Sequence, residues 1–211
     1  MAVVRDRRRC MAWHRLVRAD VGRGHADHPG SVAEPDKGAA PGSSLSDDLI
    51  DDLAAVANIL AVPKILDVVC RATGMGFAAV ARVTEHRWVA CAVRDLVDFG
   101  LVPGGELEVC TTICDVIRGS GELVVFDHAS EHELFRTHPT PKLYGFESYI
   151  SVPINRSDGS FFGTLCALDP CALSVNRPEI IGMFVLFADL IAAHLDGADR
   201  ISELAGQRAR L

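Results

Sequence analysis

No apolar run among the 211 residues reaches the roughly 18 residues that a bilayer span needs. The nearest stretch, residues 180–195, is interrupted by Asp189 and His194. The first 23 residues contain seven arginines, but the apolar segment of a signal peptide does not follow them. We therefore expect a cytoplasmic protein without a membrane partner.

The chain also lacks the even set of cysteines that a disulfide framework requires. Its seven cysteines are dispersed through apolar segments, where a free thiol behaves as a small hydrophobic group. The chain has no excess of positive charge, since its formal net charge is −7. This negative charge disfavours binding of nucleic acid by the whole chain. A composition of 49% hydrophobic residues predicts a soluble domain with a real core.

The chain divides into three parts by composition. Residues 1–44 are basic and then rich in Gly, Pro, Ser and Ala, which predicts a disordered tail and linker. A wrongly assigned start codon would produce the same pattern. Residues 45–197 form the predicted domain, and residues 198–211 extend its last helix. No internal repeat is evident, so we expect a single folded unit.

Apolar periodicity gives the order of the elements. We predict helices at 46–60, 63–73, 113–118 and 177–197, one helical turn at 131–136, and strands at 77–83, 87–93, 123–126, 149–154 and 161–168. Loops are predicted at 95–109 and over most of 127–146. This order predicts an α+β fold in which helices cover an antiparallel sheet.

The segment 144–170 has the clearest pattern. Its two strands alternate with a period of two around the turn Arg156-Ser157-Asp158-Gly159-Ser160, which is typical of a hairpin. One face is aliphatic. The other carries an aromatic residue with small polar or soft groups, namely Tyr149, Ser151, Thr164 and Cys166. Such a face suits the floor of a small-molecule pocket.

The sequences SYISVPI and GTLCALDP, joined by the polar turn, resemble the central hairpin of a GAF domain. The similarity is closest to GAF sensor domains of bacterial histidine kinases, and the segment from His138-Pro139-Thr140-Pro141 to Phe146 strengthens it. The resemblance covers about residues 45–195. It implies a GAF-like sheet of five to six strands with helices on both faces, and a role in signal transduction.

The resemblance also implies a ligand pocket between the sheet and a lid. The lid would contribute Phe135, His138, Leu143, Tyr144 and Phe146. Another wall would contain Phe99, Thr112, Ile113 and Val116. The floor would be Tyr149, Ser151, Thr164 and Cys166. The alternative is that these side chains pack on one another without a ligand, since many GAF domains serve only to dimerise or to transmit a signal.

Two groups of GAF domains have sequence motifs for their ligands, bilins or cyclic nucleotides, and this chain can be compared with both. The residue before His138 is Thr137, so the thiol for a covalently bound bilin is absent and we do not expect that cofactor. Non-covalent binding of haem or bilin is not excluded, and His128, His132 or His138 would be the residue that binds it. The Asn-Lys-Phe-Asp-Glu pattern of cyclic-nucleotide GAF domains is not found.

The connection 127–138 carries Asp127, His128, His132, Glu133 and His138. On a helix, two histidines four apart share a face and bind metal, but we expect a hydrogen-bonded surface loop and no metal.

Three functions are compatible with the sequence. The first is a sensory domain that binds a small molecule, forms a homodimer through its terminal helices and signals to a separate output protein. The second is a dimerisation or adaptor module without a ligand. The third is a redox enzyme resembling the free methionine sulfoxide reductases and using Cys110, Cys114 or Cys166. We expect a non-enzymatic sensor.

Overall fold

The computed structural model describes residues 47–208, so the tail predicted at 1–44 lies outside the described residues. The helices are α2 (Asp47–Ala57), α3 (Val62–Thr73), α4 (Ile113–Ser120), α5 (Pro139–Tyr144) and α6 (Pro178–Arg208). The 3-10 turns are η1 (Val109–Thr111) and η2 (Ala129–Glu131). The strands are β1 (Phe77–Val83), β2 (Trp88–Asp95), β3 (Glu106–Leu107), β4 (Val124–Phe126), β5 (Ser148–Asn155) and β6 (Phe161–Asp169).

The six strands form one antiparallel sheet in the order β3-β2-β1-β6-β5-β4, which confirms the predicted α+β fold. The predicted hairpin is β5–β6, and its register pairs Ser151 with Cys166. Gly163 lets β1 approach, because a Cβ atom there would lie 1.9 Å from the carbonyl oxygen of Ala81. Strand β3 was expected to be loop. Two residues are too short to show alternation, and β3 exists only because β2 pairs with it.

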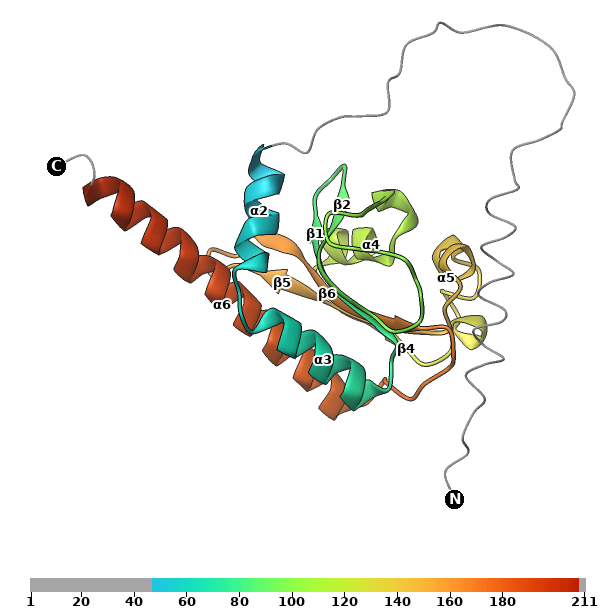
Figure 1. Cartoon of the computed structure of the whole chain (residues 1–211). Helices are drawn as coiled ribbons and strands as arrows, with labels where there is room; N and C mark the ends of the chain where they lie inside the picture. The colour runs from blue at the N-terminus through green and yellow to red at the C-terminus, as the bar shows by residue number, and fades with distance from the viewer. Residues whose placement is uncertain (1–46, 209–211) are drawn as a thin grey trace, which may run out of the picture.

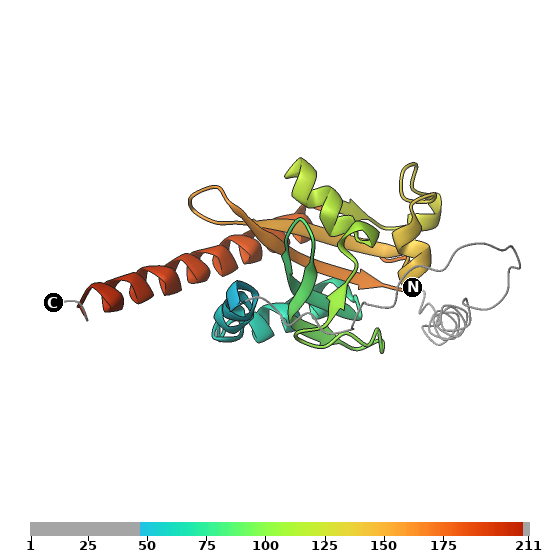
Figure 2. The same ribbon diagram turned by 90° about the horizontal axis from the view of Figure 1, so that it is seen from above.

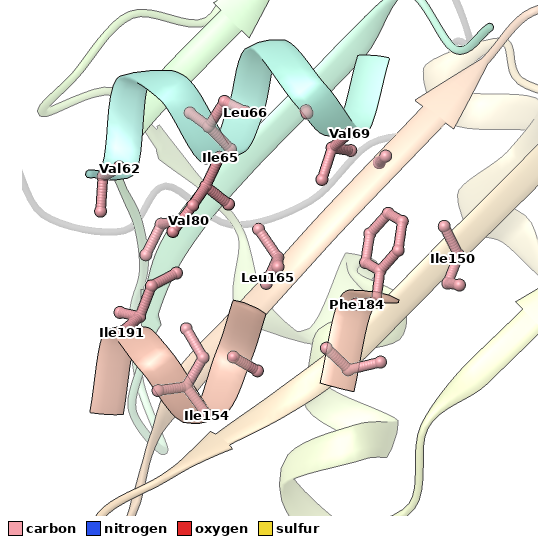
Figure 3. Close-up of a cluster of buried hydrophobic side chains, with 14 of the residues drawn as sticks. Val62, Ile65, Leu66, Val69, Val80, Ile150, Ile154, Leu165, Phe184 and Ile191 are labelled. Carbon is pink, nitrogen blue, oxygen red and sulfur yellow. The ribbon is translucent and has the colours of Figure 1, made fainter. Parts of the chain in front are cut away.

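One face of the sheet is aliphatic and is covered by α2, α3 and α6 (Figure 1). Side chains from α3 and α6 meet those of the central strands, with Phe184 and Ile191 opposite Leu165 and Ile154 (Figure 3). In α6 the buried residues lie on one side of the helix, because nearly all of them are three or four residues apart. They are Ile180, Phe184, Ala188, Ile191, Ala192 and Leu195. This layer is the larger of the two cores.

Helix α6 is 31 residues long and runs without a break beyond Gly197. Its C-terminal half projects past the sheet (Figures 1 and 2). The segment Pro178–Ile201 is long and apolar enough to cross a membrane by length and composition, despite Asp189 and His194, whereas no such segment was expected. A core helix of a soluble protein meets the same criterion, and 33% of the apolar window of α6 is buried, on the side that packs on the sheet.

The opposite face of the sheet is covered by α4, α5 and the connection between β4 and β5 (Figure 2). The helical turn predicted at 131–136 is present as a single turn between η2 and α5, closed by a 3.1 Å hydrogen bond from the backbone N–H of Arg136 to the carbonyl oxygen of His132. Pro139 occupies the first turn of α5, the Nδ1 atom of His138 accepts a hydrogen bond from the backbone N–H of Thr140, and Gly145 ends the helix with φ +69°. The two prolines therefore start a helix where a loop was expected.

Candidate functional site

A small cavity lies between the sheet and the α4–α5 layer. Fourteen residues line it: Phe77, Trp88, Phe99, Leu101, Leu107, Thr112, Ile113, Cys114, Thr140, Tyr144, Phe146, Tyr149, Cys166 and Leu168. Its free volume is about 30 Å³, which is room for one or two water molecules. In this closed arrangement the site holds no metabolite-sized space, so a larger ligand requires the covering layer to move.

Aromatic rings form the apolar wall of the cavity. The ring of Phe146 stacks on that of Tyr149 at 5.4 Å and on that of Phe126 at 6.3 Å. Phe146 also lines a second, outer hollow of about 320 Å³. That hollow is bounded by Ala129, Ser130, Phe135, Arg136, Pro141, Lys142 and Glu147 in addition to Phe146. The side chain of Phe146 is therefore common to the inner cavity and the outer hollow.

The polar part of the site is centred on the thiol of Cys114. The hydroxyl of Thr164 donates a 3.3 Å hydrogen bond to Cys114 Sγ, and the phenol oxygen of Tyr149 lies 3.5 Å from the same sulfur. Cys166 borders the same cavity as Cys114. All four side chains are buried. The site thus concentrates several potential donors on one sulfur atom in a region of low dielectric.

These contacts shift the pKa values of the Cys114 and Cys166 thiols in opposite directions. The hydrogen bonds from Cys166, and then from Thr164 and Tyr149, favour the thiolate of Cys114 and lower its pKa, although burial acts the other way. The neighbouring Cys114 and burial raise the pKa of Cys166 well above its usual range. Burial likewise raises the pKa of Tyr149. Cys114 is therefore the thiol of the pair that loses its proton first.

Two buried polar atoms on this side of the sheet have no hydrogen-bond partner. They are Trp88 Nε1, whose ring lines the cavity, and Ser151 Oγ, which is opposite Cys166 in the β5–β6 register. The indole N–H favours the thiolate of Cys114 electrostatically, but it lies outside hydrogen-bonding geometry. An unpartnered buried donor costs free energy, and a bound molecule with an acceptor atom would remove that cost for Trp88.

The structure brings together seven of the thirteen residues expected to bind a ligand. The cavity is lined by Phe99, Thr112, Ile113, Tyr144, Phe146, Tyr149 and Cys166. The other six do not line it: Val116, Phe135, His138, Leu143, Ser151 and Thr164. That any of them binds a ligand stays a prediction.

Each of the six has a definite place. Val116 is 45% exposed because the buried face of α4 consists of Ile113, Cys114 and Ile117. Leu143 is 38% exposed, and His138 caps α5. Phe135 lines the outer hollow, while Ser151 and Thr164 are buried in the sheet.

Several lining residues were missed. Phe77 and Leu168 are cross-strand partners, and Leu168 follows Cys166 by two residues, so strand alternation could have found it. Trp88 gave no sequence signal, because its place depends on the pairing of β1 with β2. Cys110 and Cys114, two of the three cysteines named for a redox enzyme, lie in different surroundings, because Cys110 is exposed in η1 whereas Cys114 is buried against the sheet. No disulfide joins the cysteines in the described part of the chain.

The polar residues of the 127–138 connection serve local structure. Asp127 accepts hydrogen bonds from the backbone N–H groups of Val175 and Asn176. His132 Nδ1 accepts from Leu134 N at 3.2 Å, and His128 lies near Glu131. Within residues 47–208, no group of three or more His, Cys, Asp or Glu side chains is placed to hold a metal ion.

Comparison with known proteins explains this architecture. A family model described as GAF domain matches residues 59–195, which is more than half of the chain. The chain belongs to the GAF domain family. This family consists of sensory and regulatory ligand-binding domains. A search of curated proteins finds no match.

Solved GAF structures share the fold at low sequence identity. The GAF domain region of a putative membrane protein from Geobacter sulfurreducens PCA has a TM-score of 0.55 at 13% identity, covering 71% of this chain and 99% of that chain. The blue-light absorbing form of the Thermosynechococcus elongatus PixJ GAF domain has a TM-score of 0.55 at 14% identity, with coverages of 80% and 97%. Free methionine-R-sulfoxide reductase from Neisseria meningitidis, solved with its substrate, has a TM-score of 0.52 at 16% identity, with coverages of 77% and 98%.

Proposed function

We propose that this GAF domain is a cytoplasmic, non-enzymatic sensor that binds a small molecule under the α4–α5 layer and signals as a homodimer through α6 to a separate output protein. The observation that carries the proposal is the lid-side cavity with a buried, unpartnered indole N–H at Trp88. Apolar pockets with a few convergent polar groups are the usual form of small-molecule sites.

The lining indicates the chemistry of the ligand. Aromatic and aliphatic side chains surround the cavity, and neither Lys, Arg, Asp nor Glu lines it. A charged metabolite would therefore lose its hydration without a compensating partner. A neutral, largely apolar molecule with one acceptor atom for Trp88 Nε1 fits the site best.

Entry of such a molecule requires Phe146 to move. The inner cavity is too small for a metabolite, but Phe146 lines both this cavity and the larger outer hollow. Rotation of this ring, together with a shift of α5, would join the two spaces. A ligand that occupies the joined space selects the displaced arrangement of the lid and so shifts the population of states.

The output path would run through the β5–β6 hairpin. Arg156 in the hairpin turn binds both Asp196 and Asp199 of α6, and the backbone N–H of Ser157 donates to Asp196. Tyr149 and Cys166, which line the cavity, belong to the same two strands. A change in the pocket thus has a continuous covalent and hydrogen-bonded route to the last helix.

A second copy of the chain is the partner that α6 fits. Leu186, Leu190, Ile201 and Leu204 are successively four, eleven and three residues apart, which places them on one side of a helix with 3.6 residues per turn. All four are exposed, and the core residues Phe184, Ile191 and Leu195 occupy the opposite side. Two parallel α6 helices would bury this stripe in the manner of a short coiled coil.

Ligand binding is tested by native mass spectrometry, an absorption spectrum and a thermal-shift panel of neutral aromatic metabolites. Bound material, or a rise in melting temperature that Trp88→Phe abolishes, is expected. Absorption bands above the protein region would identify haem, flavin or non-covalent bilin instead. A pocket that stays closed to every probe, with a featureless spectrum, would overturn the ligand-binding part of the proposal.

Dimerisation is tested by light scattering with Leu190→Glu, which puts a charge in the exposed stripe. A shift from dimer to monomer is expected. Val185→Glu is the matched control, because it introduces the same charge at an exposed apolar position on a side of α6 turned away from the stripe. A wild type that is monomeric at all accessible concentrations would contradict the homodimer.

The small volume of the cavity favours one second candidate, the dimerisation or adaptor module without a ligand. It predicts that the dimer persists when cavity residues are replaced and that no probe shifts the melting temperature. The two candidates therefore differ in the thermal-shift result and agree in the light-scattering result.

A further inference from the structure

We propose that Cys114 and Cys166 form a peroxide-sensitive thiol pair that oxidises to a disulfide between α4 and β6. The inference goes beyond the sensor function, and it holds whether or not the cavity takes a metabolite. It rests on the position of the two thiols, on the hydrogen bonds around Cys114 and on the water-sized space that both thiols line.

The two cysteines come from segments far apart in the chain. Cys114 lies on the buried face of α4, and Cys166 lies in the centre of the sheet between Ala79 of β1 and Ser151 of β5. Both thiols border the same cavity, and Cys114 Sγ accepts a hydrogen bond from Thr164, which precedes Cys166 by two residues on the same face of β6. Formation of an S–S bond of about 2.05 Å therefore requires the two side chains to approach each other across the contact between α4 and β6.

The surroundings of Cys114 favour its thiolate, which is the reactive form of cysteine. Thr164 donates a hydrogen bond to Cys114 Sγ, and Tyr149 lies at hydrogen-bonding distance from the same atom. Cys166, by contrast, is held in its neutral form by burial and by the neighbouring sulfur. This asymmetry assigns Cys114 as the attacking thiol and Cys166 as the resolving thiol.

The reaction balances with hydrogen peroxide as the oxidant. The Cys114 thiolate attacks one peroxide oxygen, the O–O bond breaks, and hydroxide leaves and takes up a proton to give water. The resulting sulfenic acid is then attacked by the Cys166 sulfur, which forms the S–S bond and releases a second water. Two thiols lose two electrons and two protons in total, and one peroxide molecule becomes two water molecules.

The cavity beside Cys114 and Cys166 has space for the oxidant. A cavity of about 30 Å³ accepts a molecule little larger than water, which peroxide is and a metabolite is not. The disulfide would tie α4 to the sheet and fix the wall of the cavity. Oxidation would therefore hold the lid side of this domain in its closed arrangement.

The experiment uses the full chain, reduced, freed of reductant and treated with graded hydrogen peroxide. Peptide mapping is expected to find the Cys114–Cys166 cross-link, with the loss of two hydrogens in the intact mass, before Cys70, Cys91 or Cys171 is modified. The oxidised protein is expected to melt about 5 °C or more above the reduced protein. This measurement on the wild type does not depend on any variant folding.

Three cysteine variants distinguish the attacking thiol from the resolving thiol. Cys166→Ser is expected to accumulate a sulfenic acid at Cys114 that dimedone traps, whereas Cys114→Ser should form no cross-link and leave Cys166 unreactive. Cys110→Ser is the matched control, because Cys110 is exposed in η1 and should not affect the cross-link.

Thr164→Val keeps both thiols and removes one donor, so it is expected to slow Cys114 oxidation about tenfold. Oxidation confined to Cys110, or equal rates in wild type and Thr164→Val, would overturn the proposal.

Discussion

Arg156, in the turn between β5 and β6, donates a hydrogen bond of 2.7 Å from Nε to Asp196 in α6. The same guanidinium binds Asp199 one turn further along. The two carboxylates raise the pKa of Arg156, and the hydrogen bonds from Ser157 and Arg156 lower that of Asp196. This ion pair lies where α6 leaves the sheet, so it sets the point from which the helix projects.

Arg156→Ala is expected to release the projecting half of α6. Without the guanidinium, the backbone amides after Asp196 should exchange about tenfold faster in hydrogen–deuterium exchange. The reason is that losing one hydrogen bond to a charged group lowers the free energy of local opening by an amount that corresponds to about this factor. Arg118→Ala is the control, since Arg118 pairs with Asp115 within α4, far from α6 in the chain. Unchanged exchange in α6 would show that packing alone holds the helix.

Phe146→Ala is expected to join the inner cavity to the outer hollow. The loss of a buried ring should reduce the free energy of unfolding by about 3 kcal/mol or more. The variant should also gain a rise in melting temperature with indole, which fits the enlarged space. Leu143→Ala on the exposed side of α5 is the control and should change stability by less than about 0.5 kcal/mol. Destabilisation without indole binding would argue against Phe146 as the partition.

Ser151→Ala and Thr164→Val remove two buried hydroxyls with different partners. The Ser151 hydroxyl has none, so its removal is expected to leave stability unchanged or slightly raised in chemical denaturation. The Thr164 hydroxyl donates to Cys114, and its removal should cost about 1 kcal/mol. A loss of stability in Ser151→Ala would indicate that a bound molecule satisfies this hydroxyl in solution.

The His138 cap makes α5 sensitive to pH. Burial lowers the pKa of His138 below its ordinary value of 6.5, so the folded chain binds the proton more weakly than the unfolded chain. Stability is therefore expected to fall as the pH drops from 6.5 toward the lowered pKa, and to change no further below it. Urea unfolding across this range measures the effect.

His138→Asn is the matched variant for this test. Asparagine keeps a cap acceptor and does not titrate, so it should remove this contribution to the pH dependence at little cost. His138→Ala should lose about 1 kcal/mol at every pH. An identical pH profile in wild type and His138→Asn would show that another group is responsible.

Local pattern was sufficient for most of the fold. The alternation in β5 and β6 predicted both the hairpin and the chemical difference between its two faces, because side chains in a strand point to opposite sides. Apolar periodicity likewise predicted the helix over 177–197, and the buried face of α6 carries Phe184, Ile191 and Leu195. Element ends shifted by a few residues, and β3 and α5 were missed. Strand β3 depends on its neighbour, and α5 on the cap at His138.

The site was predictable only in part. Tyr149 and Cys166 followed from strand alternation, and Tyr144 and Phe146 from the resemblance to GAF domains. Val116 was misplaced because the phase of a helix of eight residues depends on what it packs against. Trp88 was missed because only sheet pairing brings it to the cavity.

The sequence by itself determined a two-faced antiparallel sheet, a long final helix and the absence of a cysteine beside His138, because these depend on neighbours along the chain. Only the tertiary structure decided that Cys114 faces Cys166, that Arg156 holds Asp196, and that the closed cavity has room for little more than water. The physical reason is distance along the chain. Arg156 and Asp196 are 40 positions apart, and Cys114 and Cys166 are 52 apart, so each pair is brought together only when the elements pack. The volume of the cavity depends on how closely the side chains around it pack, which no local pattern specifies.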